Sequence, residues 1–104
     1  MKVMVRVIMQ FLPGKMAESM KLLDESLALA NKKYGYIPKI KKYTTWFGEV
    51  NAINTVITEM EWDSLTQMAD FYKKLEADPE MMQTMPQWEK VEESHKEELY
   101  MVME

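Results

Sequence analysis

The apolar pattern of the chain changes its period at Pro13-Gly14, and this change constrains the fold more than any other feature. Before it, every odd position of residues 3–11 is apolar, and an alternation of period two is typical of a β-strand. After it, apolar residues recur at steps of four and three, as on the buried face of an amphipathic helix. These residues are Met16, Met20, Leu23, Leu27, Ala30 and Tyr34. We therefore predict a strand at residues 2–11, a turn, and a helix that ends at Gly35.

The second face of this predicted strand carries both apolar and polar side chains. Its even positions hold Lys2, Met4, Arg6, Ile8 and Gln10, so two apolar side chains stand between polar ones. A strand with a solvated face normally shows a cleaner alternation. We therefore expect neither face of the strand to be freely exposed to water.

Two further strands follow the first helix. Pro38 disfavours helix, and residues 39–47 are rich in β-branched and aromatic side chains, which predicts a strand. Residues 48–52 (GEVNA) have the composition of a turn, and residues 53–62 form a third strand that pairs with the second as an antiparallel hairpin. One face of this third strand holds Val56, Thr58, Met60 and Trp62, and the other holds Ile57, Glu59 and Glu61.

The last third of the chain is predicted to be helical and then extended. Asp63-Ser64, with Gln67 at capping-box spacing, begins a helix that stops near Ala77. Residues 78–80 (Asp-Pro-Glu) begin a further helical piece, which Pro86 must bend or split. Residues 98–103 are short and largely apolar, and we predict a terminal strand there.

The predicted order of strand, helix, strand, strand, helix, strand is that of an α+β, ferredoxin-like βαββαβ fold. The chain of 104 residues has the size of one domain, so we assign residues 1–104 to it. Two helices cover one face of a four-stranded antiparallel sheet, and the other face carries Met4, Ile8 and Ile57. A second copy of the same sheet is the simplest cover, which predicts a homodimer with two-fold symmetry.

Composition excludes several classes of protein. The chain has no cysteine, which excludes disulfides, thiolate catalysis and iron-sulfur ligation. Its net charge is -4 with both signs dispersed, so we expect no nucleic-acid partner. No segment has the length of apolar sequence that a membrane span needs, and the first residues lack the apolar region and the small-residue cleavage site that are typical of a signal peptide. We expect a cytoplasmic protein that does not bind membranes.

Two stretches resemble the dimeric α/β-barrel superfamily, in particular its NIPSNAP-like and antibiotic-biosynthesis-monooxygenase-like (ABM-like) members. The first is FLPGK, where a strand meets a helix, and the second is VITEMEWDSLTQMADFYKKLEADPEM. The resemblance implies subunits that pack sheet to sheet as a barrel, with a ligand cavity between the sheet and the helices of each subunit. Relatives include oxygenases, haem degraders, isomerases, dehydratases and proteins of no known activity, so the resemblance informs the fold more than the function.

The resemblance does not extend to haem chemistry. Haem-degrading members use an Asn on the first strand, a Trp near the end of the third strand and a His on the second helix. Trp62 stands at a comparable strand end, but the nearest amide on the first strand is Gln10, and residues 78–88 hold no His. We therefore expect no cofactor.

Several residues are candidates for a site, each with a structural alternative. Arg6 and either Glu59 or Glu61 can meet across neighbouring strands, as a structural ion pair or as an anchor for a ligand. His95, the only histidine, is predicted in a loop between the last helix and the last strand, as a base or simply as a hydrated side chain. The catalytic candidates are Arg6, Tyr43 and His95, and the predicted ligand pocket holds Arg6, Tyr43, Glu59, Trp62, Met82 and Trp88.

The chain contains 12 methionines, including Met81, Met82 and Met85. Thioethers bind Cu(I), but no His or Cys is near enough in the sequence to complete such a site. Flexible methionines also fill irregular cores and pockets, and we favour that interpretation and expect no metal.

These observations lead to three functional hypotheses. The first is a homodimer whose subunit cavity binds a small apolar or aromatic organic ligand. The second is a cofactor-independent monooxygenase of the antibiotic-biosynthesis type, and the third is a structural or interaction dimer with a closed cavity. The sequence leaves open whether the chain is an enzyme.

Overall fold

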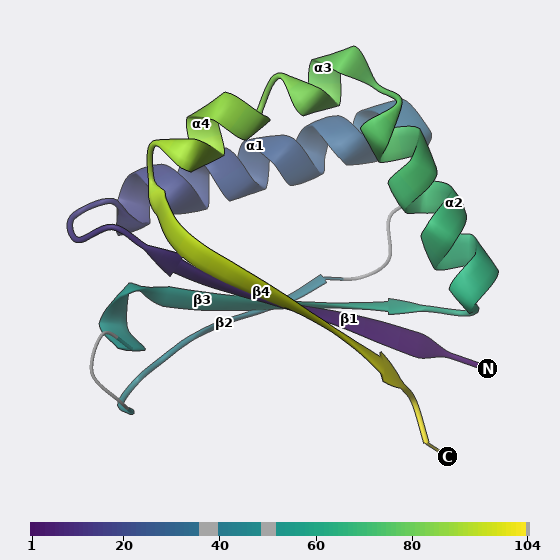
Figure 1. Cartoon of the computed structure of the whole chain (residues 1–104), viewed down its shortest axis with the longest axis horizontal. Helices are drawn as coiled ribbons and strands as arrows, with labels where there is room; N and C mark the ends of the chain where they lie inside the picture. The colour runs from purple at the N-terminus through teal and green to yellow at the C-terminus, as the bar shows by residue number, and fades with distance from the viewer. Residues whose placement is uncertain (36–39, 49–51, 104) are drawn as a thin grey trace.

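The structure is a computed structural model, and it describes residues 1–35, 40–48 and 52–103. Its elements in chain order are β1 (Val3–Phe11), α1 (Met16–Tyr34), β2 (Ile40–Thr44), the 3₁₀ turn η1 (Ala52–Asn54), β3 (Thr55–Trp62), α2 (Leu65–Glu76), α3 (Pro79–Met82), α4 (Met85–Glu89) and β4 (Glu92–Met101) (Figure 1). This order confirms the predicted α+β, ferredoxin-like arrangement.

The four strands form one antiparallel sheet in the order β2-β3-β1-β4. This order confirms that the first strand lies between the third and the fourth, and that β2 and β3 form a hairpin. β1 begins beside the end of β4, where the Val102 backbone N–H donates to the Lys2 carbonyl at 2.9 Å. The two ends of the described chain therefore lie close together (Figure 1).

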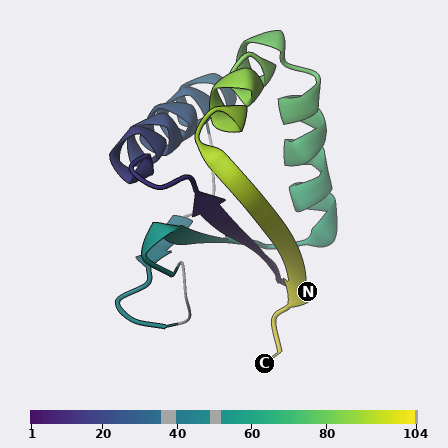
Figure 2. The ribbon, with the colours of Figure 1, turned by 60° about the vertical axis from the view of Figure 1, so that its left-hand side comes forward.

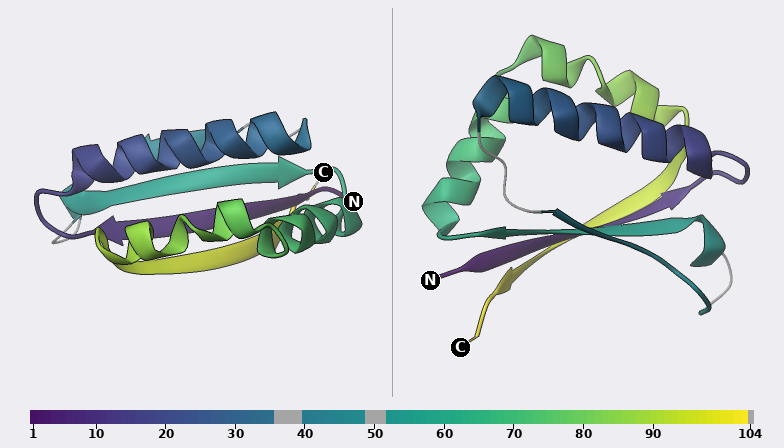
Figure 3. Two further views of the ribbon diagram at one scale, coloured as in Figure 1. Left: turned by 90° about the horizontal axis from the view of Figure 1, so that it is seen from above. Right: turned by 180° about the vertical axis from the view of Figure 1, so that it is seen from behind.

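The sheet has one face covered by helices and one face that the helices leave open (Figure 2). α1 lies over the β2-β3 half of the sheet, whereas α2, α3 and α4 follow the β4 side (Figure 3). The odd residues of β1 point toward the helices, and Val3, Val5, Met9 and Phe11 are buried there. The even residues point to the open face, as the period of two requires.

α1 lies between two glycines in the left-handed backbone region. Gly14 has φ 79° in the turn that leads from β1 to the helix, and Gly35 has φ 70° at its end. The Gly35 N–H donates to the Asn31 carbonyl at 3.0 Å, which closes the last turn. The Pro13-Gly14 junction is therefore a turn between strand and helix.

The caps of the following helices agree with the predicted signals. The Ser64 hydroxyl accepts from the Gln67 N–H at 3.1 Å, and the Gln67 side-chain oxygen accepts from the Asp63 N–H at 2.9 Å. Asp78 caps α3 by accepting from the Glu80 N–H at 3.0 Å. The predicted split at Pro86 is confirmed, since this proline lies in the first turn of α4.

The prediction for the last strand was wrong at its start. β4 begins at Glu92 rather than at residue 98, so His95 lies within a strand instead of a loop. Residues 92–98 are mostly charged, so the apolar pattern gave no sign that the strand begins there. β4 is an edge strand that pairs only with β1 among the described strands, and charged side chains are common on such edges.

The hairpin strands are also shorter than predicted. β3 begins at Thr55 because Ala52–Asn54 forms η1, and Thr44 already pairs with Val56. Residues 45–47, predicted as strand, lie outside β2, which ends at Thr44. Lys39 and residues 49–51 of the predicted strand and turn lie outside the described residues.

The buried core has two clusters on the helix-covered face. One joins Met9, Phe11, Leu23 and Val56, and the other joins Val3, Val5 and Trp62. Among the residues that the structure describes, no helix is both long and apolar enough to cross a membrane.

Candidate functional site

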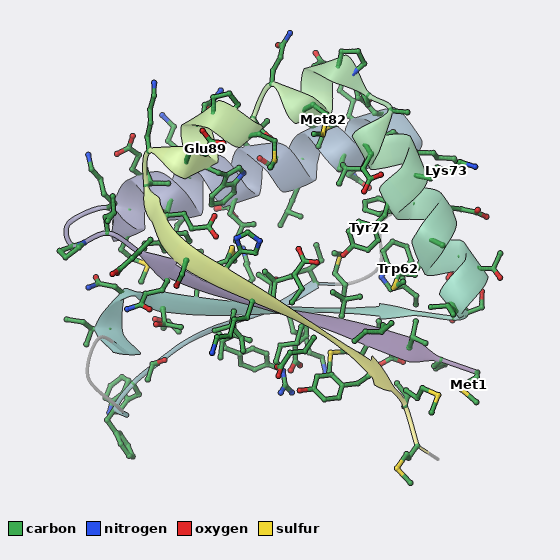
Figure 4. All side chains as sticks on the ribbon, in the orientation of Figure 1. Met1, Trp62, Tyr72, Lys73, Met82 and Glu89 are labelled. Carbon is green, nitrogen blue, oxygen red and sulfur yellow. The ribbon has the colours of Figure 1, made fainter. Side chains whose placement is uncertain are left out.

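A cavity of about 270 Å³ lies between the helix-covered face of the sheet and the helices, beside the two core clusters. Its walls come from all four strands and all four helices, and most of them are apolar. The lining residues are Val7, Met9, Leu23, Ser26, Leu27, Ala30, Ile40, Thr58, Met60, Phe71, Tyr72, Leu75, Met81, Met82, Thr84, Met85, Trp88 and Glu97. In Figure 4 the labelled Tyr72 lies in this space between α2 and the sheet, and Met82 lies above it on α3.

The floor of the cavity is a row of side chains that crosses the sheet. Val7 on β1 pairs with Thr58 on β3 and with Glu97 on β4, and all three residues line the cavity. The alternation of the strands brings them to the same face. One carboxylate therefore stands at the β4 side of an otherwise uncharged floor.

The opening of the cavity is marked by lining residues that are also exposed. Met82 is 40% exposed and Met85 is 49% exposed, although both line the cavity. Glu97 is likewise exposed at the edge strand. Long, flexible thioethers at an opening can adapt to ligands of different shapes.

The position of the methionine helix α3 depends on Asp78. The Lys33 ammonium lies 2.9 Å from both Asp78 carboxylate oxygens, and the Tyr34 hydroxyl donates to Oδ2 at 2.9 Å. The bond from Lys33 is the main cause that lowers the pKa of Asp78 to about 2. Since Lys33 and Tyr34 end α1, this cluster joins α1 to the start of α3 and so holds Met81 and Met82 over the cavity.

Tyr72 is a polar side chain deep in the apolar wall. Burial is the main cause that raises its pKa to about 12, and the Glu97 carboxylate adds to the rise. No hydrogen bond joins the Tyr72 hydroxyl to another described residue. The phenol therefore stays neutral at physiological pH and is free to donate or accept inside the cavity.

Ser26 on α1 is the second polar group without a partner. Its Oγ is buried and has no hydrogen-bond partner among the described residues, and the residue lines the cavity. Such a hydroxyl is unfavourable unless a ligand or water reaches it. Thr84, by contrast, satisfies its hydroxyl by donating to the Met81 carbonyl at 2.7 Å.

Of the predicted pocket residues, the structure brings Met82 and Trp88 to this cavity. Trp88 also stacks on Phe11, with ring centroids 6.1 Å apart. Trp62 faces the same side of the sheet but is only 1% exposed. Its ring packs against Phe71, with the ring centroids 4.9 Å apart. It lines a separate hollow beside α2, and its Nε1 has no hydrogen-bond partner among the described residues.

The other predicted pocket residues lie on the open face of the sheet, away from the cavity. The Arg6 Nε donates to Glu59 Oε2 at 2.9 Å, so the predicted cross-strand pair is present. The Tyr43 hydroxyl donates to the other oxygen of Glu59 at 3.2 Å. The Arg6 guanidinium also lies 5.1 Å from the centre of the Tyr100 ring, a cation–π contact. Even positions of β1 and odd positions of β3 share this face, so these groups cannot reach a ligand beneath the helices.

His95 faces the helix-covered side, because it pairs with Met9 on β1. Its Nδ1 lies 2.6 Å from the Glu92 carboxylate. It is not among the residues that line the cavity, although Glu97 is two positions further along the same strand face. In the described part of the chain, no group of three His, Asp or Glu side chains is placed to hold a metal ion.

Several side chains of the cavity escaped sequence reasoning. Ser26 is a polar residue among the apolar residues of the first helix, and Glu97 lies within a run of charged residues, so neither was distinguished by the sequence pattern. The signal for Glu97 was the strand alternation, but it is readable only once β4 is known to start at Glu92. Tyr72 lies on α2, and no signal in the sequence distinguished it as a pocket residue.

The fold of this chain is similar to that of several solved structures. A NIPSNAP family protein from Agrobacterium tumefaciens superposes with a TM-score of 0.81 at 22% identity, covering 100% of this chain and 95% of that one. A NIPSNAP domain protein from Burkholderia xenovorans superposes with a TM-score of 0.78 at 19% identity, covering 99% of this chain and 95% of that one. This chain has the NIPSNAP-like fold. No family model matches the sequence, and no curated protein matches it either.

The NIPSNAP-like fold is shared with an enzyme. SnoaB from Streptomyces nogalater, a cofactor-independent oxygenase, superposes with a TM-score of 0.70 at 13% identity, covering 99% of this chain and 94% of that one. At this identity the likeness shows the ABM-like ferredoxin fold and not the activity.

Proposed function

We propose that the chain binds a small, largely apolar or aromatic organic ligand in the cavity between sheet and helices, as a cytoplasmic homodimer. The cavity of about 270 Å³ with its mostly apolar wall is the observation that carries the proposal. An apolar cavity of roughly 150 Å³ already admits benzene, so this one has room for a larger ligand. The unpartnered hydroxyls of Ser26 and Tyr72 offer a ligand a few polar contacts, as small-molecule sites usually do.

A cavity-filling variant tests this proposal. Ser26→Leu puts an apolar side chain into the cavity from α1, while Ala28→Leu makes a similar addition on the exposed face of the same helix. Nile red, a neutral apolar dye, should bind the natural protein and the Ala28→Leu variant equally. Binding by Ser26→Leu should weaken roughly tenfold, since the dye and the new side chain compete for one space. Equal binding by all three proteins would place the dye elsewhere and overturn the proposal.

The homodimer is proposed from the open face of the sheet. Ile8 pairs with Ile57 at the centre of that face, and Met4 lies further along the same strand. Tyr43 and Tyr100 add aromatic surface beside them. These apolar and aromatic side chains surround the Arg6–Glu59 pair, and apolar surface on one side of a sheet favours a self-complementary contact with two-fold symmetry.

Sedimentation at micromolar concentration tests the dimer. The natural protein should sediment as a dimer, and Ile8→Glu should sediment as a monomer because it places an additional carboxylate opposite Ile57, at the centre of the contact. Ala28→Glu, on the exposed face of α1, is the matched control and should stay dimeric. A monomer for the natural protein would refute this part of the proposal.

The second candidate is a cofactor-independent monooxygenase, which the likeness to SnoaB favours. In such a reaction the ligand itself reduces dioxygen: a CH₂ group becomes a carbonyl, and the second oxygen atom leaves as water with the two hydrogens. Among the catalytic candidates Arg6, Tyr43 and His95, only His95 faces the helix-covered side, where its Glu92 partner would support a base.

Oxygen uptake distinguishes the two candidates. The oxygenase hypothesis predicts uptake with electron-rich phenols or anthrones that His95→Gln abolishes, while Arg6→Gln and Tyr43→Phe retain it. Ligand binding without uptake across such a panel would leave the first function alone.

A further inference from the structure

The cavity has one charged lining residue among those described, and it is an acid. Glu97 stands at the opening, while the other polar side chains of the wall are the hydroxyls of Ser26, Thr58, Tyr72 and Thr84. Within the part of the chain that the structure describes, no Lys, Arg or His lines the cavity. Its electrostatic character is therefore negative at the opening and neutral within.

Lys42 and His95, which share the helix-covered face of the sheet with Glu97, have acidic partners. The Lys42 ammonium lies 2.9 Å from the Asp24 carboxylate, and His95 is held by Glu92 at 2.6 Å. Glu97 itself forms no ion pair with any described residue. Its carboxylate is thus available to a group that enters from outside.

The surroundings of Glu97 suit the polar end of an amphipathic ligand. Met82 and Met85 flank the opening with exposed apolar surface, and Tyr72 lies within the field of the carboxylate. An apolar chain or ring can occupy the cavity while its polar head stays at the opening beside Glu97. The head is then only partly desolvated, which lets it keep a charge.

We propose that the cavity selects apolar organic amines, with the ammonium head paired to Glu97 at the opening, and that it discriminates against carboxylates. This inference rests on the proposed ligand binding and adds the chemical class of the ligand. An ammonium gains a charge-assisted hydrogen bond from the carboxylate, and a ligand carboxylate meets like charge with no cation among the described lining residues to offset it.

The test is calorimetric titration at pH 7 with three probes of one chain length: octylamine, octanol and octanoate. We expect octylamine to bind the natural protein roughly tenfold tighter than octanoate, with the affinity of octanol between them. This difference in affinity is what one partly solvated ion pair for the amine, and one charge repulsion for octanoate, should produce. Glu97→Gln should bring the amine and octanoate affinities within about twofold of each other and leave octanol unchanged. Glu89→Gln, which removes the same charge from exposed α4 outside the cavity, should keep the natural preference.

The outcomes separate the two proposals. Octanoate binding as tightly as octylamine, or a preference that survives Glu97→Gln, would overturn the selectivity while octanol binding upholds the ligand site. Failure of all three probes to bind would overturn the ligand site and the selectivity together. Glu97 is exposed on an edge strand, so its replacement by Gln leaves the core intact.

Discussion

Replacing Ser26 by alanine is expected to stabilise the protein, although most substitutions of buried residues do the opposite. The Ser26 Oγ is buried beside the cavity and has no partner among the described residues. In the folded protein no described residue replaces the hydrogen bonds that this hydroxyl makes with water in the unfolded chain. Alanine removes that cost and fits the helix better than serine does.

The magnitude follows from these two contributions. An unsatisfied buried polar group costs about 1–3 kcal/mol. The higher helix propensity of alanine adds about 0.5 kcal/mol. Taking the lower end of the first range, we expect Ser26→Ala to raise the free energy of unfolding by about 1.5 kcal/mol, or the melting temperature by roughly 6–12 °C.

Urea unfolding followed by tryptophan fluorescence provides the assay, since Trp62 and Trp88 pack in the folded interior. Ser64→Ala is the matched control with the opposite expected sign. The Ser64 hydroxyl caps α2 by accepting from the Gln67 N–H at 3.1 Å, so its loss should cost about 1 kcal/mol. The same chemical change should therefore raise the urea midpoint at one serine and lower it at the other.

A Ser26→Ala variant that is as stable as the natural protein, or less stable, would refute this reasoning. It would mean that the hydroxyl is satisfied in solution, by water or by a bound molecule. A Ser64→Ala variant without loss would instead contradict the assignment of the α2 cap.

Three further predictions concern stability. The pKa of Asp78 is lowered from 3.8 to about 2. The ionised Asp78 carboxylate therefore stabilises the fold fully above its ordinary pKa, and this stabilisation is lost as the pH falls toward 2. The urea midpoint should fall more between about pH 5 and pH 2 for the natural protein than for Asp78→Asn. Gly35→Ala should cost about 1 kcal/mol in thermal unfolding because φ is 70°, and Gly35→Asn should cost less, since asparagine tolerates this region; equal losses would contradict the backbone argument. Phe11→Ala should cost roughly 3–5 kcal/mol because the ring is 0% exposed, and a loss below about 1 kcal/mol in urea unfolding would show that Phe11 is not a core residue.

The sequence predicted the topology because its signals were local and repeated. The alternation in β1 and β3 assigned each residue to a face, so a contact of Arg6 with Glu59 or Glu61 was predicted, and the structure pairs Arg6 with Glu59. Caps at Ser64 and Asp78 set the starts of α2 and α3 for the same reason.

The candidate site was predicted less well, because a pocket depends on tertiary packing. The predicted set combined Arg6, Tyr43 and Glu59 with Met82 and Trp88, which lie on opposite faces of the sheet. The alternation already placed Arg6 away from the helices. The inward position of Glu97 was not predicted, because a charged edge strand has no apolar period that marks where the strand begins.

The crystal structure of the protein grown with octylamine tests the central claim most directly. The account predicts two copies joined through their open sheet faces and, in each copy, density for the alkyl chain beneath the helices with its ammonium beside Glu97. A cavity filled by the protein's own side chains, or octylamine bound only outside it, would contradict the account.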